Sequence, residues 1–466
     1  MTPRFVLLYS IVAAGLAFAT AASAEVPTGD WIGQLSSGFK VRVHISNTNS
    51  GNSGYSGYLT NPSGNETAFD QVVCDGAHLH FSVKKLNLSY DAEWNGKEHA
   101  WSGNLIFQQI YPLTLKRATA ADIAPAVHKR PQEEAISAGQ LPYQQIDVLF
   151  DNRVAHNRLA GTLTMPLGGG PFPAVVLVSG TGHNTRDEDV WDHKVFLVLA
   201  DALSRRGFAV LRYDKRGVGG STGNYDAATT ADFATDADAA VIWLRTHPKI
   251  DPEQIGILGH SEGGIIAPLV AASDNNVAFV LMIAGPALRG DKLFVEQSAM
   301  TAKAYGAPQD YVERRKLFDQ QLYRAIVAAP STAEAHTVAD GLVAEGIKDH
   351  LVDQNEAEAL ASNDTSVWER YFLAYDPAPT LARLKIPVLA VYGSLDVQVP
   401  GTDDAMAASD ALRGNPNSVV VLLPGKNHLM QDAKTGGPNE YNDIEETISP
   451  SALNLIVGWL ADLPTK

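Results

Sequence analysis

The sequence predicts an α/β fold built on a doubly wound sheet, with a helical insertion and with a small all-β domain in front of it. From residue 143 onward, apolar strands alternate with helical stretches, whereas residues 25–117 carry short runs in which apolar and polar side chains alternate. The chain has 466 residues. Single cores rarely grow beyond about 250–300 residues, so we expect two domains.

The composition is that of a globular protein, with 45% hydrophobic and 19% charged residues. The formal net charge of -16 argues against nucleic acid and anionic membrane surfaces as partners, because both would repel an acidic chain. A neutral or cationic small molecule fits this charge better. The sequence leaves open whether the chain forms a homo-oligomer.

The first 24 residues have the pattern of a secretory signal peptide. Arg4 supplies the positive charge, residues 5–19 form an apolar run, and Ala22-Ser23-Ala24 provides a small-residue cleavage site. The apolar run is shorter than the about 20 residues that a membrane-spanning helix needs. We therefore expect a mature chain that begins at Glu25 and is periplasmic or secreted.

Residues 25–117 are predicted to form a small antiparallel barrel or sandwich, because the runs "KVRVHIS", "HLHFSVKK" and "HAWSGNLIFQQ" have a period of two and are separated by turn residues. His78 and His80 share a strand face, which makes a metal pair conceivable. No third ligand lies nearby in the sequence, so we expect solvent-facing histidines and no metal. Cys74 is the only cysteine, which excludes an internal disulfide, and we expect it to be a buried structural thiol.

The aromatic residues of this domain allow two interpretations. Trp31, Tyr55, Tyr58 and Trp94 could bind a polysaccharide or a second subunit, or they could form the core of the domain. We favour a scaffold that rims the active site or mediates dimerisation. Residues 118–142 show little periodicity and are interpreted as a linker to the second domain.

Residues 143–466 are predicted to form the α/β domain. A starting hairpin, "QQIDVLF" and "RLAGTLTMP", precedes six apolar strands: "FPAVVLVSG", "GFAVLRYD", "QIGILGH", "VAFVLMIAG", "IPVLAVYGS" and "SVVVLLPG". Such near-continuous apolar strands are typical of a parallel sheet that is buried on both faces. A helix with Val195, Val198, Leu199 and Ala202 on one face and Gly207 past its end separates the first two of them.

A helix-rich stretch at about 286–380 interrupts the alternation, and its length favours a cap over the catalytic face. Four aromatic residues near its end have two open interpretations: they could line an acyl pocket, or they could form the core of the cap. They are Trp368, Tyr371, Phe372 and Tyr375.

The segment "ILGHSEGGI" predicts a nucleophilic serine at Ser261. An apolar strand enters this segment and a helix leaves it, and a serine on such a sharp turn projects its hydroxyl group. Strand and helix nearly touch there, so the residues two positions away must be small. Gly259 and Gly263 meet that need.

The predicted base and acid follow later strands. Of the three histidines after Ser261, His336 and His350 fall in the cap, whereas His428 follows the last predicted strand. Asp396 follows the preceding strand and is predicted to fix the tautomer of His428. Asp403 and Asp404 come close behind, but they open the next predicted helix, where acidic residues commonly act as caps.

Two backbone N–H groups are needed for a developing oxyanion. We expect one from Glu262, directly after the nucleophile, and one from Thr181, with Gly182 as the adjacent alternative. Arg186 and Asp187 are expected to pin the Thr181 loop by an ion pair.

Three other features near the predicted site receive minor roles. His183 and His193 precede the nucleophile and occupy no strand end, so we assign them substrate contact at most. The glycine-rich segment 212–225 lacks the spacing of a phosphate-binding loop. It is interpreted as a structural turn below the active site.

From Gln144 to the end the chain resembles α/β-hydrolase serine esterases, and in particular an exported subgroup. The resemblance is carried by the patterns "GxG...RDxD", "YDKRGxGxS", "GHSEGG", "YDPxPxLxxLxxPVLAxxGxxDxQVP" and "PGxNHLM". One departure is Ser179-Gly180, where the family often has His-Gly. The resemblance implies hydrolysis of short to medium acyl esters by a Ser-His-Asp triad, without a metal or organic cofactor. A secreted serine peptidase or amidase of the same fold is the alternative.

Overall fold

The computed structural model describes residues 26–35, 40–48, 54–60, 66–84, 88–107, 109–123, 128–349, 351–352, 360 and 366–463. The predicted signal peptide, residues 1–24, lies outside these ranges. None of the helices within them is both long enough and apolar enough to cross a membrane.

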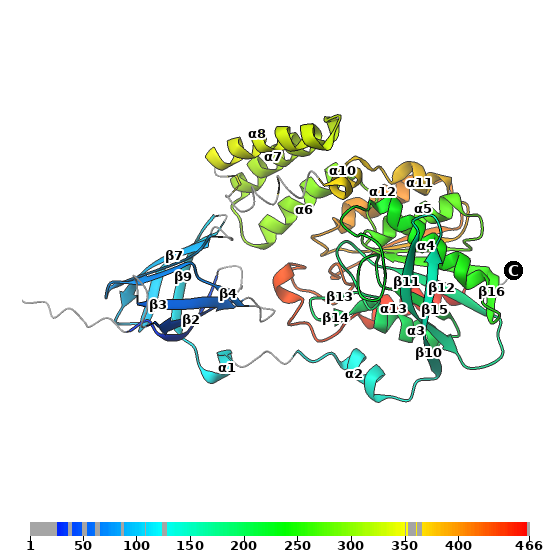
Figure 1. Ribbon diagram of the computed structural model, residues 1–466, viewed down its shortest axis with the longest axis horizontal. Helices are drawn as coiled ribbons and strands as arrows, with labels where there is room; N and C mark the ends of the chain where they lie inside the picture. The colour runs from blue at the N-terminus through cyan, green and yellow to red at the C-terminus, as the bar shows by residue number, and fades with distance from the viewer. Residues whose placement is uncertain are drawn as a thin grey trace, which may run out of the picture.

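The N-terminal domain is one antiparallel sheet, as its period-two pattern predicts. Its order is β4-β3-β2-β1-β9-β8-β7-β6-β5, and Figure 1 shows it apart from the larger domain. The strands are β1 (Gly29–Gln34), β2 (Lys40–Asn47), β3 (Tyr55–Thr60), β4 (Glu66–Ala68), β5 (Gln71–Cys74), β6 (His78–Val83), β7 (Leu88–Asn95), β8 (Ala100–Phe107) and β9 (Gln109–Arg117).

The sheet curls around its own core, because β3, the neighbour of the edge strand β4, also contacts β5, the edge strand at the other end. Trp31 is fully buried there, and Tyr55 and Trp94 pack against the same core. Tyr58 is half-buried and stacks on His44. These aromatic side chains therefore mainly hold the domain together. Cys74 is a half-buried free thiol at the edge of the core, rather than the buried one we expected.

The segment 118–142 contains two short helices, α1 (Ala120–Ile123) and α2 (Pro131–Ala138). The buried Arg130 guanidinium donates hydrogen bonds to the carbonyl oxygens of Asp192, Asn442 and Ile444. The second half of this segment is therefore anchored on the larger domain.

The larger domain has an eight-stranded sheet in the order β10-β11-β15-β12-β16-β17-β18-β19. The predicted hairpin and the six apolar strands are all present: β10 (Tyr143–Asn152), β11 (Asn157–Pro166), β12 (Phe172–Val178), β15 (Ala209–Tyr213), β16 (Ile250–His260), β17 (Val280–Ile283), β18 (Val388–Gly393) and β19 (Ser418–Leu423). From β15 to β19 neighbouring strands are parallel, whereas β11 is antiparallel to both of its neighbours. This is the sheet of the α/β-hydrolase fold, so the predicted fold class is confirmed.

Helices cover both faces of this sheet because its strands are apolar on both sides. One core lies between the sheet and α4 (Thr230–Arg245), α5 (Gly263–Ser273) and α12 (Gly401–Ala411). The other lies between the sheet and α3 (Val195–Ser204) and α13 (Pro450–Ala461). Gly207 ends the α3 turn with a φ of +90°, as a helix stop requires. A two-stranded ribbon, β13 (Asp189–Val190) and β14 (His193–Lys194), precedes α3.

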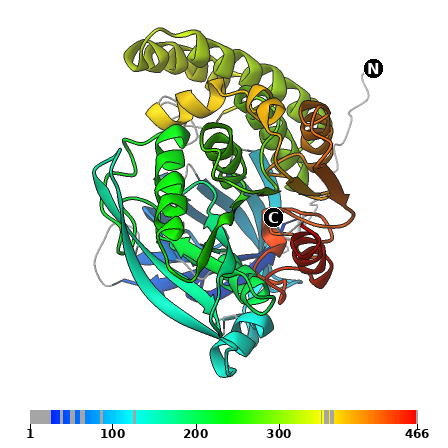
Figure 2. The same cartoon turned by 90° about the vertical axis from the view of Figure 1, so that its right-hand side faces the viewer.

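Between β17 and β18 the chain leaves the sheet and forms a group of helices, which we call the cap. They are α6 (Gly290–Ala304), α7 (Gln309–Ala328), α8 (Thr332–Lys348), α10 (Val367–Ala374) and α11 (Ala378–Arg383). In Figure 2 the long helices of the cap run across the top of the α/β domain, and the N-terminal sheet lies behind it. The cap has a core of its own, which includes Phe318, Leu322 and Ile326 of α7.

Candidate active site

Ser261 sits on a strained turn between β16 and α5. Its φ is +52°, in the left-handed region that a serine rarely adopts. The small neighbours are required: a Cβ at Gly259 would lie 1.8 Å from the Gly263 carbonyl oxygen, and a Cβ at Gly263 would lie 2.0 Å from that of Val178. The turn therefore has the nucleophile-elbow geometry that the sequence predicts.

Asp396 and His428 lie side by side after the ends of β18 and β19. The Asp396 Oδ2 atom lies 2.7 Å from His428 Nδ1, and its Oδ1 accepts backbone hydrogen bonds from Gln398 at 2.8 Å and Val399 at 2.9 Å. Both side chains are buried. A carboxylate held in this way makes Nδ1 the protonated nitrogen of the neutral imidazole, so Nε2 can accept a proton.

Asp404, the alternative acid, has a structural role instead. Its Oδ1 accepts backbone hydrogen bonds from Ala287 at 2.6 Å and Leu288 at 2.9 Å, and so ties α12 to the start of the cap. Burial raises its pKa to about 7.

His260 joins the elbow to the segment that carries His428. Its Nε2 lies 3.1 Å from the His428 carbonyl oxygen, and its Nδ1 lies 3.0 Å from Glu188 Oε1. Burial would lower the pKa of His260, but the Glu188 carboxylate and the His428 carbonyl outweigh burial and raise it. His428 is thereby fixed next to the residue that precedes Ser261. Sequence reasoning missed His260 and Glu188, although His260 lies inside the quoted motif.

Of the two predicted oxyanion donors, Glu262 directly follows Ser261 in the chain, and Thr181 lines the same cavity as Ser261. The backbone N–H groups on both sides of Thr181 already donate hydrogen bonds within the protein. Gly180 donates to Glu188 Oε1 at 2.6 Å, and Gly182 donates to the Tyr225 hydroxyl at 2.9 Å. Within the described part of the chain, neither Thr181 nor Glu262 uses its N–H in a protein hydrogen bond. The Gly182 alternative is thus less suitable than Thr181.

The Glu262 side chain has a role that the sequence did not indicate. Its fully buried carboxylate accepts hydrogen bonds from Lys215 Nζ at 2.8 Å, Thr230 Oγ1 at 2.8 Å and Trp368 Nε1 at 2.6 Å. Lys215 Nζ also donates to the Gly180 carbonyl oxygen at 2.7 Å. One ion pair therefore connects the elbow, the Thr181 loop, α4 and the cap.

This network agrees with the interpretation of segment 212–225 as a structural turn below the site, because Lys215 is buried, supports Gly180 and Glu262, and is not among the residues that line the cavity. The sequence analysis gave Lys215 itself no role. The sequence did carry a signal for Lys215. It is a charged residue just past the end of a buried strand, and the sites of parallel sheets form at such strand ends.

The predicted ion pair of the Thr181 loop is replaced by two pairs with the same segment. Arg186 binds Asp214 at 2.8 Å, and Asp187 binds Arg212 at 2.7 Å. Arg186 and Asp187 therefore do not pair with each other. Each holds the loop by pairing with a residue of segment 212–225.

The two histidines assigned to substrate contact lie in different surroundings. His193 is wholly buried and lies 2.8 Å from the Tyr441 carbonyl oxygen through Nε2, so its assignment to substrate contact was wrong. His183 is exposed, and its ring packs on Tyr225.

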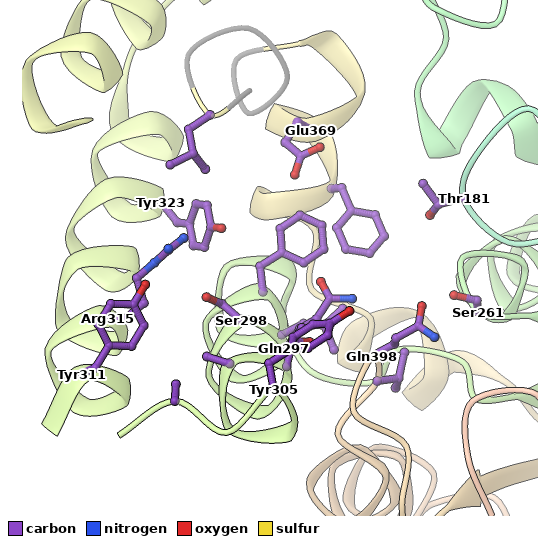
Figure 3. Close-up of a pocket in the computed structure, with 18 of the residues that line it drawn as sticks. Thr181, Ser261, Gln297, Ser298, Tyr305, Tyr311, Arg315, Tyr323, Glu369 and Gln398 are labelled. Atoms are coloured by element: carbon purple, nitrogen blue, oxygen red, sulfur yellow. The ribbon is translucent and has the colours of Figure 1, made fainter. Parts of the chain in front are cut away.

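Ser261 and Thr181 line a cavity of about 950 Å³. Figure 3 shows them on one side of it and Tyr311, Arg315 and Tyr323 of α7 on the other, with Gln297 and Gln398 between. None of the four cap aromatics belongs to the core of the cap, so that interpretation was wrong. Trp368 and Phe372 line the cavity, while Phe372 is also buried against the domain core and Tyr375 packs on it.

The described residues contain no group of three or more His, Cys, Asp or Glu side chains that could hold a metal ion. On β6, His80 pairs with Asp91 at 2.7 Å and His78 lies 4.0 Å from Glu93, in exposed positions.

Comparisons with known proteins found similar sequences and structures. Esterase EstD of Thermotoga maritima is 30% identical over 297 residues, which cover 62% of this chain and 63% of EstD. Acyl-coenzyme A thioesterase 3 of Mus musculus is 27% identical over 140 residues, 28% of this chain and 27% of the thioesterase. This chain thus spans less than two thirds of the length of either relative. The solved α/β hydrolase GrgF from Penicillium sp. sh18 is 19% identical, with a TM-score of 0.43 and coverage of 68% of this chain and 98% of GrgF.

A family match covers the strands and loops that carry the site. Residues 156–429 match the family described as X-Pro dipeptidyl-peptidase, S15. They include the elbow, Thr181, Lys215, Asp396 and His428. Because the match extends over more than half of its length, the chain belongs to the X-Pro dipeptidyl-peptidase (S15) family.

Proposed function

We propose that the protein is a serine carboxylesterase that hydrolyses short to medium acyl esters through Ser261, His428 and Asp396. The observation that carries this proposal is the strained turn that places Ser261 at a cavity, together with the buried Asp396–His428 pair, whose histidine carbonyl oxygen lies 3.1 Å from Nε2 of His260, the residue before Ser261. Similarity to esterase EstD and to a thioesterase supports the reaction class. No metal or organic cofactor takes part in the proposed reaction.

The proposed mechanism uses two steps. Ser261 Oγ attacks the ester carbonyl carbon while His428 Nε2 accepts the hydroxyl proton, and Asp396 stabilises the imidazolium. The oxyanion accepts hydrogen bonds from the Glu262 and Thr181 N–H groups. Collapse of this intermediate expels the alkoxide, which takes the proton from His428 and leaves an acyl-enzyme. Water, deprotonated by His428, then releases the acid and restores the serine.

The alternative is a peptidase or amidase of the same fold. It is supported by the match to a family that is described as a peptidase family. The two activities share the catalytic groups but differ in the leaving group. An amine must be protonated as it departs, whereas an alkoxide leaves more readily. We therefore place ester hydrolysis first.

Turnover of nitrophenyl esters, compared with aminoacyl and prolyl nitroanilides, tests the proposal. Ser261→Ala and His428→Ala should each lower kcat by a factor on the order of 10⁴ to 10⁶, and a fluorophosphonate should label the wild type at Ser261 alone. His78→Ala is the matched control, because His78 is exposed on β6 of the N-terminal sheet and outside the proposed triad, and it should keep its activity. Substantial activity in Ser261→Ala would refute the mechanism, and a preference for a nitroanilide would reassign the protein as a peptidase.

We also propose that the protein is exported to the periplasm or secreted. The support is the signal-like pattern of residues 1–24. N-terminal sequencing of protein recovered from the periplasm or the medium should begin at Glu25. An intact N-terminus on cell-retained protein would contradict export.

A further inference from the structure

The cavity at Ser261 extends beyond the α/β domain and its cap to the N-terminal sheet. Apolar residues of the N-terminal domain line the same cavity as the candidate nucleophile. They are Leu35, Val41, Leu59, Leu88, Leu105 and Tyr111. A domain outside the predicted catalytic fold therefore forms part of the wall of the candidate site.

These residues lie at one end of the curled sheet. Val41 is near the start of β2 and Leu59 near the end of β3, while Leu88 begins β7. Leu105 of β8 pairs directly with Tyr111 of β9. Since neighbouring strands of an antiparallel sheet run in opposite directions, strand starts and strand ends alternate along one rim, and these residues share it.

The same residues point into the curl of the sheet. Val41, Leu88 and Leu105 are buried members of the core of the domain, and Leu59 and Tyr111 pack against that core. Side chains on a strand alternate between faces. The rim therefore presents the apolar end of the sheet core toward the cavity, rather than an outer polar face.

The cap continues this apolar wall from the rim toward Ser261. Leu293 and Phe294 of α6, Tyr305 directly after it, and Trp368 and Phe372 of α10 line the same cavity. Burial raises the pKa of the Tyr305 hydroxyl, and the nearby Tyr111 of β9 adds to this effect. Tyr111 of β9 and Tyr305 thus both line the cavity where the two domains meet.

We propose that the rim of the N-terminal sheet binds the distal part of a medium-chain acyl group whose ester carbonyl lies at Ser261. The inference rests on the proposed esterase function and identifies its substrate class. The volume of about 950 Å³ lies near the upper end of the roughly 300–1,000 Å³ that is typical of small-molecule sites, which is more than a short acyl group fills. The acyl group is also the part of the ester that stays bound to Ser261 after the alcohol leaves.

A chain-length series on the full protein tests this inference. With nitrophenyl esters of two to twelve acyl carbons, kcat/KM of the wild type should rise about fourfold for each methylene that reaches the rim, which corresponds to about 0.8 kcal/mol per buried methylene. Leu59→Trp fills the cavity from β3, and Leu59→Gln places an amide there. Both variants should lower kcat/KM about tenfold for the ten- and twelve-carbon esters. For the two-carbon ester, kcat/KM should stay within about twofold of the wild-type value.

Ile106→Trp is the matched control. Ile106 follows Leu105 on β8 and is 39% exposed on the opposite face of the sheet, so the whole series should stay as in the wild type. A flat chain-length profile in the wild type, or equal losses at all lengths in both Leu59 variants, would overturn the inference.

A binding measurement separates this inference from the proposed function. Calorimetry of dodecanoate and of acetate with the Ser261→Ala protein needs no turnover. Dodecanoate should bind, and adding Leu59→Trp should weaken it about tenfold, whereas acetate should show no binding. An inactive wild type that still binds dodecanoate at the rim would refute the esterase proposal alone. An active esterase that binds dodecanoate equally with and without Leu59→Trp would refute the rim alone.

Discussion

Replacing Lys215 with methionine removes the positive partner of the buried ion pair beneath the candidate nucleophile. The Lys215 and Glu262 side chains are 4% and 0% exposed and 2.8 Å apart. Methionine keeps the length and apolar stem of the lysine but leaves the Glu262 carboxylate buried without a cation. Breaking such a pair from one side typically costs about 3–5 kcal/mol, because the remaining charge stays desolvated. We expect a loss of this size in the free energy of unfolding of the α/β domain.

The loss should be visible in both stability and turnover. Lys215 also donates to the Gly180 carbonyl oxygen, so its removal loosens the loop that presents Thr181, and kcat should fall more than KM rises. Urea unfolding followed by circular dichroism and by fluorescence gives the stability, provided that the two probes coincide. The double variant Lys215→Met with Glu262→Gln removes the orphaned charge, so it should be more stable than Lys215→Met alone.

Arg158→Met provides the control for this prediction. Arg158 and Asp151 form an ion pair whose side chains are 58% and 59% exposed, and solvent screens such pairs. This variant should unfold like the wild type. The reasoning is refuted if Lys215→Met also unfolds like the wild type, or if the double variant is no more stable than Lys215→Met alone.

Two further predictions concern the cap and the response to acid. Trp368→Phe keeps the ring in the cavity wall but loses the hydrogen bond to Glu262. A hydrogen bond to a charged group contributes about 1.5–3 kcal/mol, so kcat/KM should fall about tenfold or more. An unchanged kcat/KM would show that this hydrogen bond does not contribute to turnover. Burial lowers the pKa of His193 to about 4, below its unfolded value of about 6.5. The unfolded chain therefore takes up the proton first, and stability should fall by up to about 3 kcal/mol as the pH drops from about 6.5 to 4. His193→Gln should flatten that slope in urea titrations, and an unaltered slope would show that another group causes it.

The fold could be predicted from the sequence because its signals are local. Each apolar strand of the sheet is marked by its own run of side chains, and the elbow at Ser261 is marked by glycines two residues away. Asp396 and His428 could be selected because strand ends gather at one edge of a parallel sheet. The structure places these two side chains 2.7 Å apart.

The supporting network could not be predicted because it depends on contacts between distant residues. Lys215 reaches Gly180 and Glu262, which are 35 and 47 positions away, and Glu188 reaches His260, 72 positions away. No spacing rule specifies such partners. The sequence also did not show that the N-terminal sheet lines the cavity. The leucines of the rim follow the pattern of any strand that packs on a core. Only the packed structure shows that one end of that core opens to the site.

Membership of a peptidase family and a preference for esters are compatible, because substrate choice lies in the cavity rather than in the catalytic groups. A dipeptidyl-peptidase must hold the charged amino terminus of its substrate, and burying an ammonium group is costly unless carboxylates pair with it. Among the described residues that line the cavity, Glu369 is the single carboxylate, while apolar side chains predominate. An acyl chain needs no charged partner and gains free energy with each methylene that leaves water. The lining therefore favours an uncharged ester over a peptide with a free amino terminus.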